Sequence, residues 1–300
     1  MVSRLFQIGL TTVVLSCVFY MLLALMPGDP IDLAIMADPR LTAEDAVRLR
    51  ALHGLDQPLS ARYLAWTAAV LRGEFGFSRL FAQPVAALLW PALLSTLALL
   101  GWTILVAAVL GVALGVLAAL RPAMAPAVQS VALLAQAMPG FWLGIMLIVV
   151  FAVWLGWLPA GGADGWASLI LPVAALAFGQ MAAYARHAAA SMEAALREPW
   201  VRSARARGAS PRRVAWVHAL PNAAVPLLTL LGLDAGALVS GAVITETLFA
   251  RPGMGKLIFD AIMGNDYNLA LLALLVVALV TMLGGWAADI AQRALDPRLR

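Results

Sequence analysis

A polar stretch interrupts an otherwise apolar chain at residues 198–222, which read EPWVRSARARGASPRRVAWVHALPN. It holds five arginines, and apolar segments of membrane-spanning length lie on both sides of it. Pro199 suits the first turn of a helix, and Gly208 suits the position just past the end of that helix. Ser210 suits the N-cap of a second helix that runs to Pro221. The stretch therefore predicts two short helices with a sharp bend between them.

The composition around this stretch is that of an integral membrane protein. Hydrophobic residues make up 63% of the 300 residues and charged residues 12%, whereas soluble domains average about 25% charged residues. The apolar runs are long enough to cross a bilayer as helices and lack the alternation of β-barrel strands. The fold class is therefore all-α. The single cysteine, Cys17, cannot form an intrachain disulfide, so the fold needs no oxidising compartment.

We predict one domain over residues 1–300, a bundle of six transmembrane helices. Its parts are an outer loop at 27–92, a core bundle at 93–290 that contains a loop at 186–222, and a tail at 291–300. The six predicted helices cover roughly 6–26, 93–120, 131–155, 169–186, 223–249 and 269–290.

The distribution of arginine and lysine sets the predicted orientation. The short loops that would face inside if the N-terminus is inside are the arginine-rich ones, so both termini and the 198–222 stretch are predicted to be cytoplasmic. The net charge of +4 follows this sidedness and gives no reason to expect nucleic acid as a partner.

In the outer loop, two surface helices are predicted, at about 42–54 and 60–71. They either fold over the mouth of a pore or form a passive cap.

Three polar side chains inside the predicted helices are candidates for a translocation path: Asp234, Glu246 and Gln136. An intramembrane carboxylate is energetically expensive and marks a pathway or a buried pair. Asp234, near mid-membrane, would favour a cationic group in the path. The alternative is a hydrogen bond to a neighbouring helix or to a partner subunit. Gln136 precedes a Pro-Gly pair, where we expect close helix packing in preference to a gating kink.

No catalytic residue, metal site or cofactor site is predicted in this chain. Residues 251–256, RPGMGK, superficially suggest phosphate binding, but Ala250 and Leu257 stand where a P-loop needs glycine and Ser or Thr. We interpret them as a turn that enters a short re-entrant or surface segment. The three histidines lack metal-ligand spacing. Any ATP hydrolysis must therefore belong to another chain.

The 198–222 stretch resembles the cytoplasmic loop of permease subunits of binding-protein-dependent ATP-binding-cassette (ABC) importers. That family's signature is Glu-Ala-Ala, three residues, Gly, nine residues, a hydrophobic residue, any residue and Leu-Pro. Gly208 and the pair Leu220-Pro221 stand at the required spacing, and Ala204 fills the second alanine. The departures are Arg202 for the glutamate, Ser203 for the first alanine and His218 for the aliphatic residue.

These departures from the signature are typical of the dipeptide, oligopeptide and nickel branch of that family. Other segments of the chain also resemble that branch. The matching segments run through the chain in order: 25–30 (LMPGDP), 54–58 (GLDQP), 139–144 (PGFWLG), 156–159 (GWLP), 246–249 (ETLF), 252–255 (PGMG) and 295–298 (LDPR). The resemblance implies a type I ABC importer permease fold with a structured periplasmic loop after helix 1 and a coupling helix between helices 4 and 5. The implied ATPase-coupling residues are Trp200, Arg202, Ser203, Ala204, Arg205, Arg207, Gly208, Leu220 and Pro221.

The resemblance also implies a location and partners. The location is a bacterial inner membrane, with membrane lipid around the bundle. The partners are a second related permease, two cytoplasmic ATPases that hold ATP and Mg, and a periplasmic or lipid-anchored substrate-binding protein. The cargo would be peptides, with nickel, another metal complex or a non-peptide solute as the alternative. A secondary carrier is the alternative from another class, although the chain shows no internal repeat. An intramembrane hydrolase would need a Ser/His, Asp/Asp or His/Glu set of side chains inside the spans, and the sequence offers none.

Overall fold

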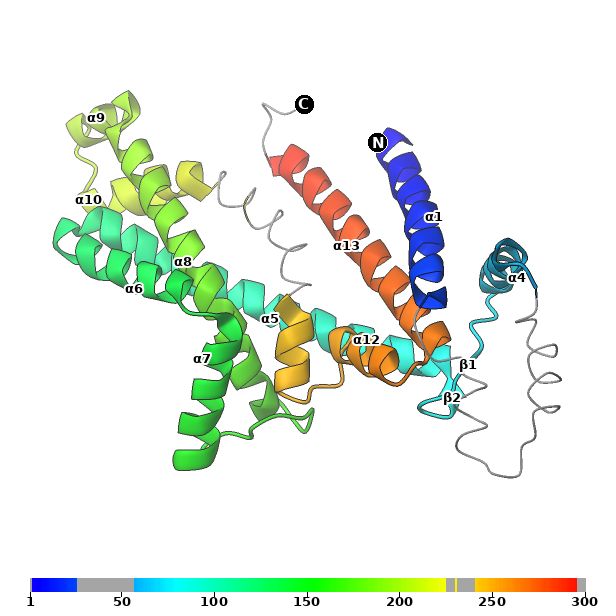
Figure 1. The fold of residues 1–300 in the computed structure, drawn as a ribbon. Coiled ribbons are helices and arrows are strands. Elements are labelled where there is room, and N and C mark those ends of the chain that lie inside the picture. The colour runs from blue at the N-terminus through cyan, green and yellow to red at the C-terminus, as the bar shows by residue number, and fades with distance from the viewer. Residues whose placement is uncertain (1, 26–56, 225–229, 231–240, 296–300) are drawn as a thin grey trace. The chain divides into compact units, whose positions relative to one another are not determined.

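The computed structural model describes residues 2–25, 57–224, 230 and 241–295, and these are almost entirely helical (Figure 1). Four of the described helices are long and apolar enough to cross a membrane: α1 (Val2–Ala24), α5 (Val85–Leu120), α8 (Ala167–Arg197) and α13 (Tyr267–Leu295). One small hairpin joins β1 (Phe77–Ser78) to β2 (Gln83–Pro84). The all-α prediction is confirmed in this coarse form.

The chain divides into two compact units. The first comprises Met1–Leu93 and Leu257–Val280, and the second Leu94–Lys256 and Thr281–Arg300.

In the first unit, α4 (Leu59–Leu71) is the surface helix predicted at 60–71. It ends before Gly73, whose φ of +83° suits glycine. The Tyr63 hydroxyl of α4 lies 2.7 Å from Ser16 Oγ of α1, and the Tyr20 and Tyr63 rings meet edge to face at 5.4 Å. These contacts fasten α4 to α1. The helix predicted at 42–54 lies outside the described residues.

The hairpin of the first unit is held by a buried acid that follows α12 (Met254–Met263). Asp266 accepts hydrogen bonds from Ser78 Oγ at 2.6 Å and from the Leu80 N–H at 3.0 Å. Its other oxygen accepts from the Leu269 N–H at 3.2 Å and so caps the first turn of α13. The turn predicted within residues 251–256 covers 251–253, and α12 begins directly after it at Met254.

In the second unit, α5 and α8 cross closely. A Cβ built on Gly111 would lie 2.7 Å from the Met181 carbonyl oxygen, and one on Gly115 would clash with the Ala185 carbonyl oxygen. Glycine at these two positions therefore allows the two helices to pack closely. Both helices exceed their predicted spans: α5 starts at Val85 and passes through Pro91, and α8 continues to Arg197.

The third predicted helix, 131–155, is not continuous. It is built from α6 (Ala125–Ala137), preceded by the 3-10 turn η1 (Pro122–Met124), and from α7 (Gly140–Leu147) with the π-helical extension η2 (Ile148–Trp154). The two halves meet at 99°. Pro139 lacks an N–H and forces Met138 into an extended conformation, with ψ of 125°. The Pro-Gly pair thus breaks the helix, contrary to our expectation that it serves packing without a kink.

The fifth predicted helix, 223–249, is described only in part. Its C-terminal part forms a helix over residues 241–248, and Asp234 lies outside the described residues. Counting the bent pair as one span, the described ranges hold up to five membrane-spanning segments.

Candidate functional site

The arginine-rich stretch folds as the two predicted helices with a bend between them. α9 (Pro199–Ala206) ends before Gly208, whose φ is +82°. The Ser210 side chain accepts a hydrogen bond from the Arg213 N–H at 3.3 Å and caps α10 (Pro211–Arg213). We call this two-helix unit the elbow, residues 199–219. Its second arm widens into the π turn η3 (Val214–Ala219) and passes through Pro221 to at least residue 224, beyond the predicted end.

One face of α9 packs against the chain itself. Val201 and Ala204, which are 1% and 3% exposed, pack on Val214 of the other arm. Trp200 is half-buried beside the same cluster, and its ring centroid lies 6.5 Å from that of His218. Ala204, one of the residues that the resemblance implies in ATPase coupling, therefore faces its own subunit.

The exposed surface of the elbow is strongly basic. We call it the arginine face, defined by exposed residues Arg202, Ser203, Arg205, Arg207, Gly208, Arg212 and Arg213. Among the described residues, no ion pair joins these arginines to an acidic side chain. Guanidinium groups that have no acidic partner within their own chain can bind carboxylates of another molecule through paired hydrogen bonds.

The elbow is fastened to the long helices of the second unit. Met192 and Ala195 near the end of α8 form one buried cluster with Ala215 and Ala219 of η3 and with Val116 of α5. Leu220 packs against this cluster, and Pro221 is exposed. This close-packed cluster joins the second arm of the elbow to α8 and α5.

Two of the three candidate path residues, Gln136 and Glu246, are among the described residues. Gln136 is exposed on α6, and Asp234 is not among the described residues. Glu246 is fully buried and accepts hydrogen bonds from Thr96 Oγ1 at 2.5 Å and from the Gly255 N–H at 2.7 Å. It therefore faces the interior of its own unit instead of an open path.

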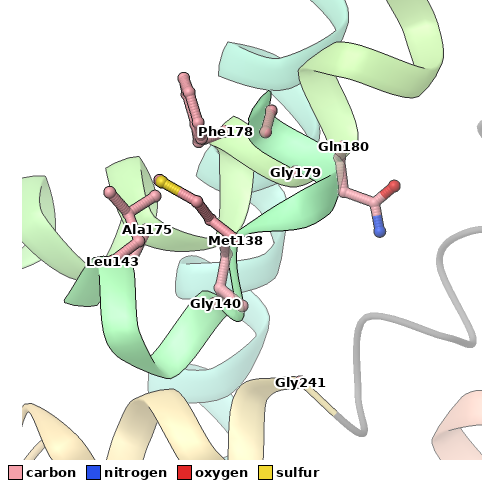
Figure 2. Close-up of a pocket in the computed structure, with 10 residues that line it drawn as sticks. Met138, Gly140, Leu143, Ala175, Phe178, Gly179, Gln180 and Gly241 are labelled. Atoms are coloured by element: carbon pink, nitrogen blue, oxygen red, sulfur yellow. The ribbon is translucent and has the colours of Figure 1, made fainter. Parts of the chain in front are cut away.

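A cavity of about 240 Å³ lies at the break of the bent helix, which sequence reasoning did not find (Figure 2). It is bordered by the break on one side and by α8 on the other, and Gln180 contributes an amide to a mainly apolar lining. The labelled lining residues are Met138, Gly140, Leu143, Ala175, Phe178, Gly179, Gln180 and Gly241. The available signal was Gln180, a glutamine inside an apolar predicted span. No metal-binding group of His, Cys, Asp or Glu occurs in the part of the chain that the structure describes.

Residues 111–300 match the family model described as the binding-protein-dependent transport system inner membrane component. The chain belongs to this family. It is a multi-pass permease subunit of an ABC importer, the inner membrane component of the transport system.

Three curated relatives of this permease cover nearly the whole chain. A probable peptide ABC transporter permease of Sinorhizobium fredii is 36% identical over 291 residues, 94% of this chain and 92% of the relative. A di/tripeptide transport permease of Pseudomonas aeruginosa is 36% identical over 317 residues, with the same coverages. A glutathione transport permease of Escherichia coli is 33% identical over 306 residues, 100% of this chain and 98% of the relative.

The fold of the permease is similar to that of a solved ABC transporter. An inward-facing crystal form of the MetNI methionine ABC transporter superposes with a TM-score of 0.60 at 21% identity. The match covers 71% of this chain and 98% of that one. At this identity the likeness concerns the fold alone.

Proposed function

We propose that the permease forms half of the path through which an ATP-driven importer moves peptides or a related small solute. The named substrates of the relatives, which are peptides, di/tripeptides and glutathione, support this class. The observation that carries the proposal is the elbow, because it exposes arginines without acidic partners among the described residues while its other face is packed onto α8 and α5. A secondary carrier has no use for such a docking module.

The topology that goes with this function has six transmembrane helices and cytoplasmic termini. The core bundle at 93–290 and the tail at 291–300 belong to one permease domain, and residues 27–92 form a periplasmic loop in a type I importer fold. The concentration of arginine in the elbow supports a cytoplasmic position for it.

The proposed partners are a second permease, two ATPases with ATP and Mg, and a substrate-binding protein. The arginine face contacts the ATPase, with Arg202, Arg205 and Arg207 pairing with acidic groups there and Gly208 allowing close approach. Three other residues of the set, Trp200, Ala204 and Leu220, pack inside the subunit and hold the elbow in place, while the exposed Pro221 adds to the ATPase-facing surface. Closure of the ATPases around ATP moves α9, and α8 and α5 follow.

For the path, we propose contributions from Asp234, Gln136 and the cavity beside Gln180. Replacing Asp234 by Asn should lower uptake of cationic peptides more than that of neutral ones. Equal losses for the two peptide classes would remove Asp234 from the path. The same comparison with a nickel complex as probe separates peptide transport from the metal-complex alternative.

The test of the function is co-purification followed by transport. The permease, expressed with the partner genes next to its own, should bring down an ATPase and, in proteoliposomes with ATP inside, import a labelled tripeptide from the binding protein. Uptake without any bound ATPase, driven by an ion gradient, would establish a secondary carrier and overturn the proposal.

A further inference from the structure

Glu246 joins three segments of the second unit through its carboxylate. Oε1 accepts from Thr96 Oγ1 of α5 at 2.5 Å, and Oε2 accepts from the N–H groups of Gly255 and Lys256 at 2.7 and 3.3 Å. The Thr96 hydroxyl in turn accepts from the Met254 N–H at 2.8 Å. The first-turn amides of α12, which have no partner within their own helix, are thus bonded to Glu246 and Thr96. We call these residues the Glu246 clamp.

The clamp is closely fitted, and glycines make the fit possible. A Cβ on Gly253 would overlap the Glu246 carboxylate, and a Cβ on Gly255 would clash with the Val243 backbone. Neither glycine has a positive φ, so the requirement is for space. Residues 252–255, PGMG, therefore let the start of α12 approach the helix over 241–248.

The turn between these segments is strained and enclosed. The Arg251 N–H donates to the Glu246 carbonyl oxygen at 2.8 Å, which closes the helix with Ala250 in the left-handed region at φ +47°. The Arg251 side chain is 6% exposed, and its Nε has no hydrogen-bond partner among the described residues. Burial lowers the pKa of Arg251 from its ordinary value, and the negative charge of Glu246 opposes that shift.

A buried carboxylate is a costly way to join helices, because apolar residues of the same volume often hold such a site more stably. Unlike apolar contacts, the hydrogen bonds of a carboxylate are directional, because each oxygen meets donors at fixed positions. The positive end of the α12 helix dipole also favours the negative charge of Glu246. Such a joint fixes one geometry of the three segments and resists sliding.

We propose that Glu246 is a positioning residue for transport, whose carboxylate makes the start of α12, Thr96 of α5 and the helix over 241–248 move as one body. This deepens the function proposed above and rests on it. Glu246 acts through the segments it joins, without touching the cargo.

The test uses the full transporter with its partners in nanodiscs, a labelled tripeptide as probe, and the variants Glu246→Gln, Thr96→Val and Thr96→Ser. In Glu246→Gln, an NH₂ group replaces one carboxylate oxygen, so one set of hydrogen bonds to the α12 amides or to Thr96 is lost. In Thr96→Val, the hydroxyl that bridges Glu246 and Met254 is removed. We expect both to assemble with basal ATP hydrolysis within about twofold of wild type, and the substrate-stimulated increment to fall by about tenfold, the range of a typical coupling free energy. Thr96→Ser keeps the hydroxyl and should restore the increment.

Hydrogen exchange supplies a readout that does not depend on transport. The amides of residues 254–256 should exchange faster in Glu246→Gln and Thr96→Val than in wild type, by at least about tenfold if an opening of the clamp limits exchange. Unchanged exchange would overturn the proposal, as would a stimulated increment within about twofold of wild type or a loss in strict proportion to poorer assembly. A wild-type transporter with no ATP-dependent uptake would instead refute the proposed function, and the exchange result would still decide whether the clamp exists.

Discussion

The elbow and the Glu246 clamp handle charge in opposite ways. The elbow exposes its arginines and buries small apolar residues, so that Val201 and Ala204 pack on Val214 while the guanidinium groups face outward. The clamp buries its carboxylate completely and surrounds it with donors from its own chain. Charge in the elbow is thus available to another molecule, whereas charge in the clamp is used within the subunit.

The largest expected effect comes from placing a charge on the buried face of the elbow. Ala204→Asp puts an unpaired carboxylate against Val201 and Val214, which costs several kcal/mol and should lower uptake more than about hundredfold. Ala206→Asp, on the exposed face of the same helix, should lower uptake by about tenfold at most. Uptake and ATPase co-purification of the two variants provide the comparison. Equal losses would mean that α9 has no buried face.

A methyl group inside the clamp should have the next largest effect. Gly253→Ala pushes a Cβ into the Glu246 carboxylate, and overpacking of this kind destabilises by about 1 to 3 kcal/mol. Gly284→Ala is the control, because a methyl group added there in α13 would meet nothing within 4 Å. Thermal unfolding of the two purified permeases should show a lower midpoint for Gly253→Ala alone. If the two midpoints agree, the clamp is not closely fitted.

Charge reversal on the arginine face should weaken docking moderately. Arg205→Glu should lower affinity for the ATPase about tenfold, equivalent to roughly 1.4 kcal/mol, and the defect should shrink as salt is raised. Arg197→Glu is the matched control, because Arg197 is exposed next to the elbow and its guanidinium group lies 3.8 Å from the Glu193 carboxylate of its own helix. Binding of the ATPase to permease nanodiscs at two salt concentrations measures both. A salt-independent loss would point to misfolding of the elbow.

The smallest expected effect is a gain in the stability of the permease. Ala250 holds a left-handed conformation that favours glycine, so Ala250→Gly should stabilise the permease by up to about 1 kcal/mol. A raised unfolding midpoint with unchanged uptake is the expected result. A lowered midpoint would show that the turn beside the clamp is not strained.

The elbow could be predicted because its determinants are local. Pro199, Gly208 and Ser210 each specify a backbone position by their own chemistry, and their spacing fixes two helices and a bend. Which face of α9 is buried could not be predicted, because Val214 meets Ala204 only after the chain has turned.

The clamp could not be predicted because its partners are distant in sequence. Thr96 lies 150 residues before Glu246 and looks like an ordinary residue of an apolar helix. Sequence reasoning identified Glu246 as an expensive intramembrane acid that marks a pathway or a buried pair, and counted it among the candidate path residues. Pro139 was the sequence signal for the break, because it has no N–H to continue a helix, but a Pro-Gly pair also suits close helix packing.

The central claim is that the elbow transmits ATP-driven motion, and Gly208 tests it most directly. Gly208→Arg adds a long side chain at a left-handed position in the arginine face, whereas Gly165→Arg imposes the same backbone strain outside the elbow, at φ +76°. The measurement is ATP hydrolysis in nanodiscs with and without the loaded binding protein. We predict that Gly208→Arg inserts normally but loses substrate stimulation, while Gly165→Arg keeps it. Normal stimulation in Gly208→Arg would contradict the claim.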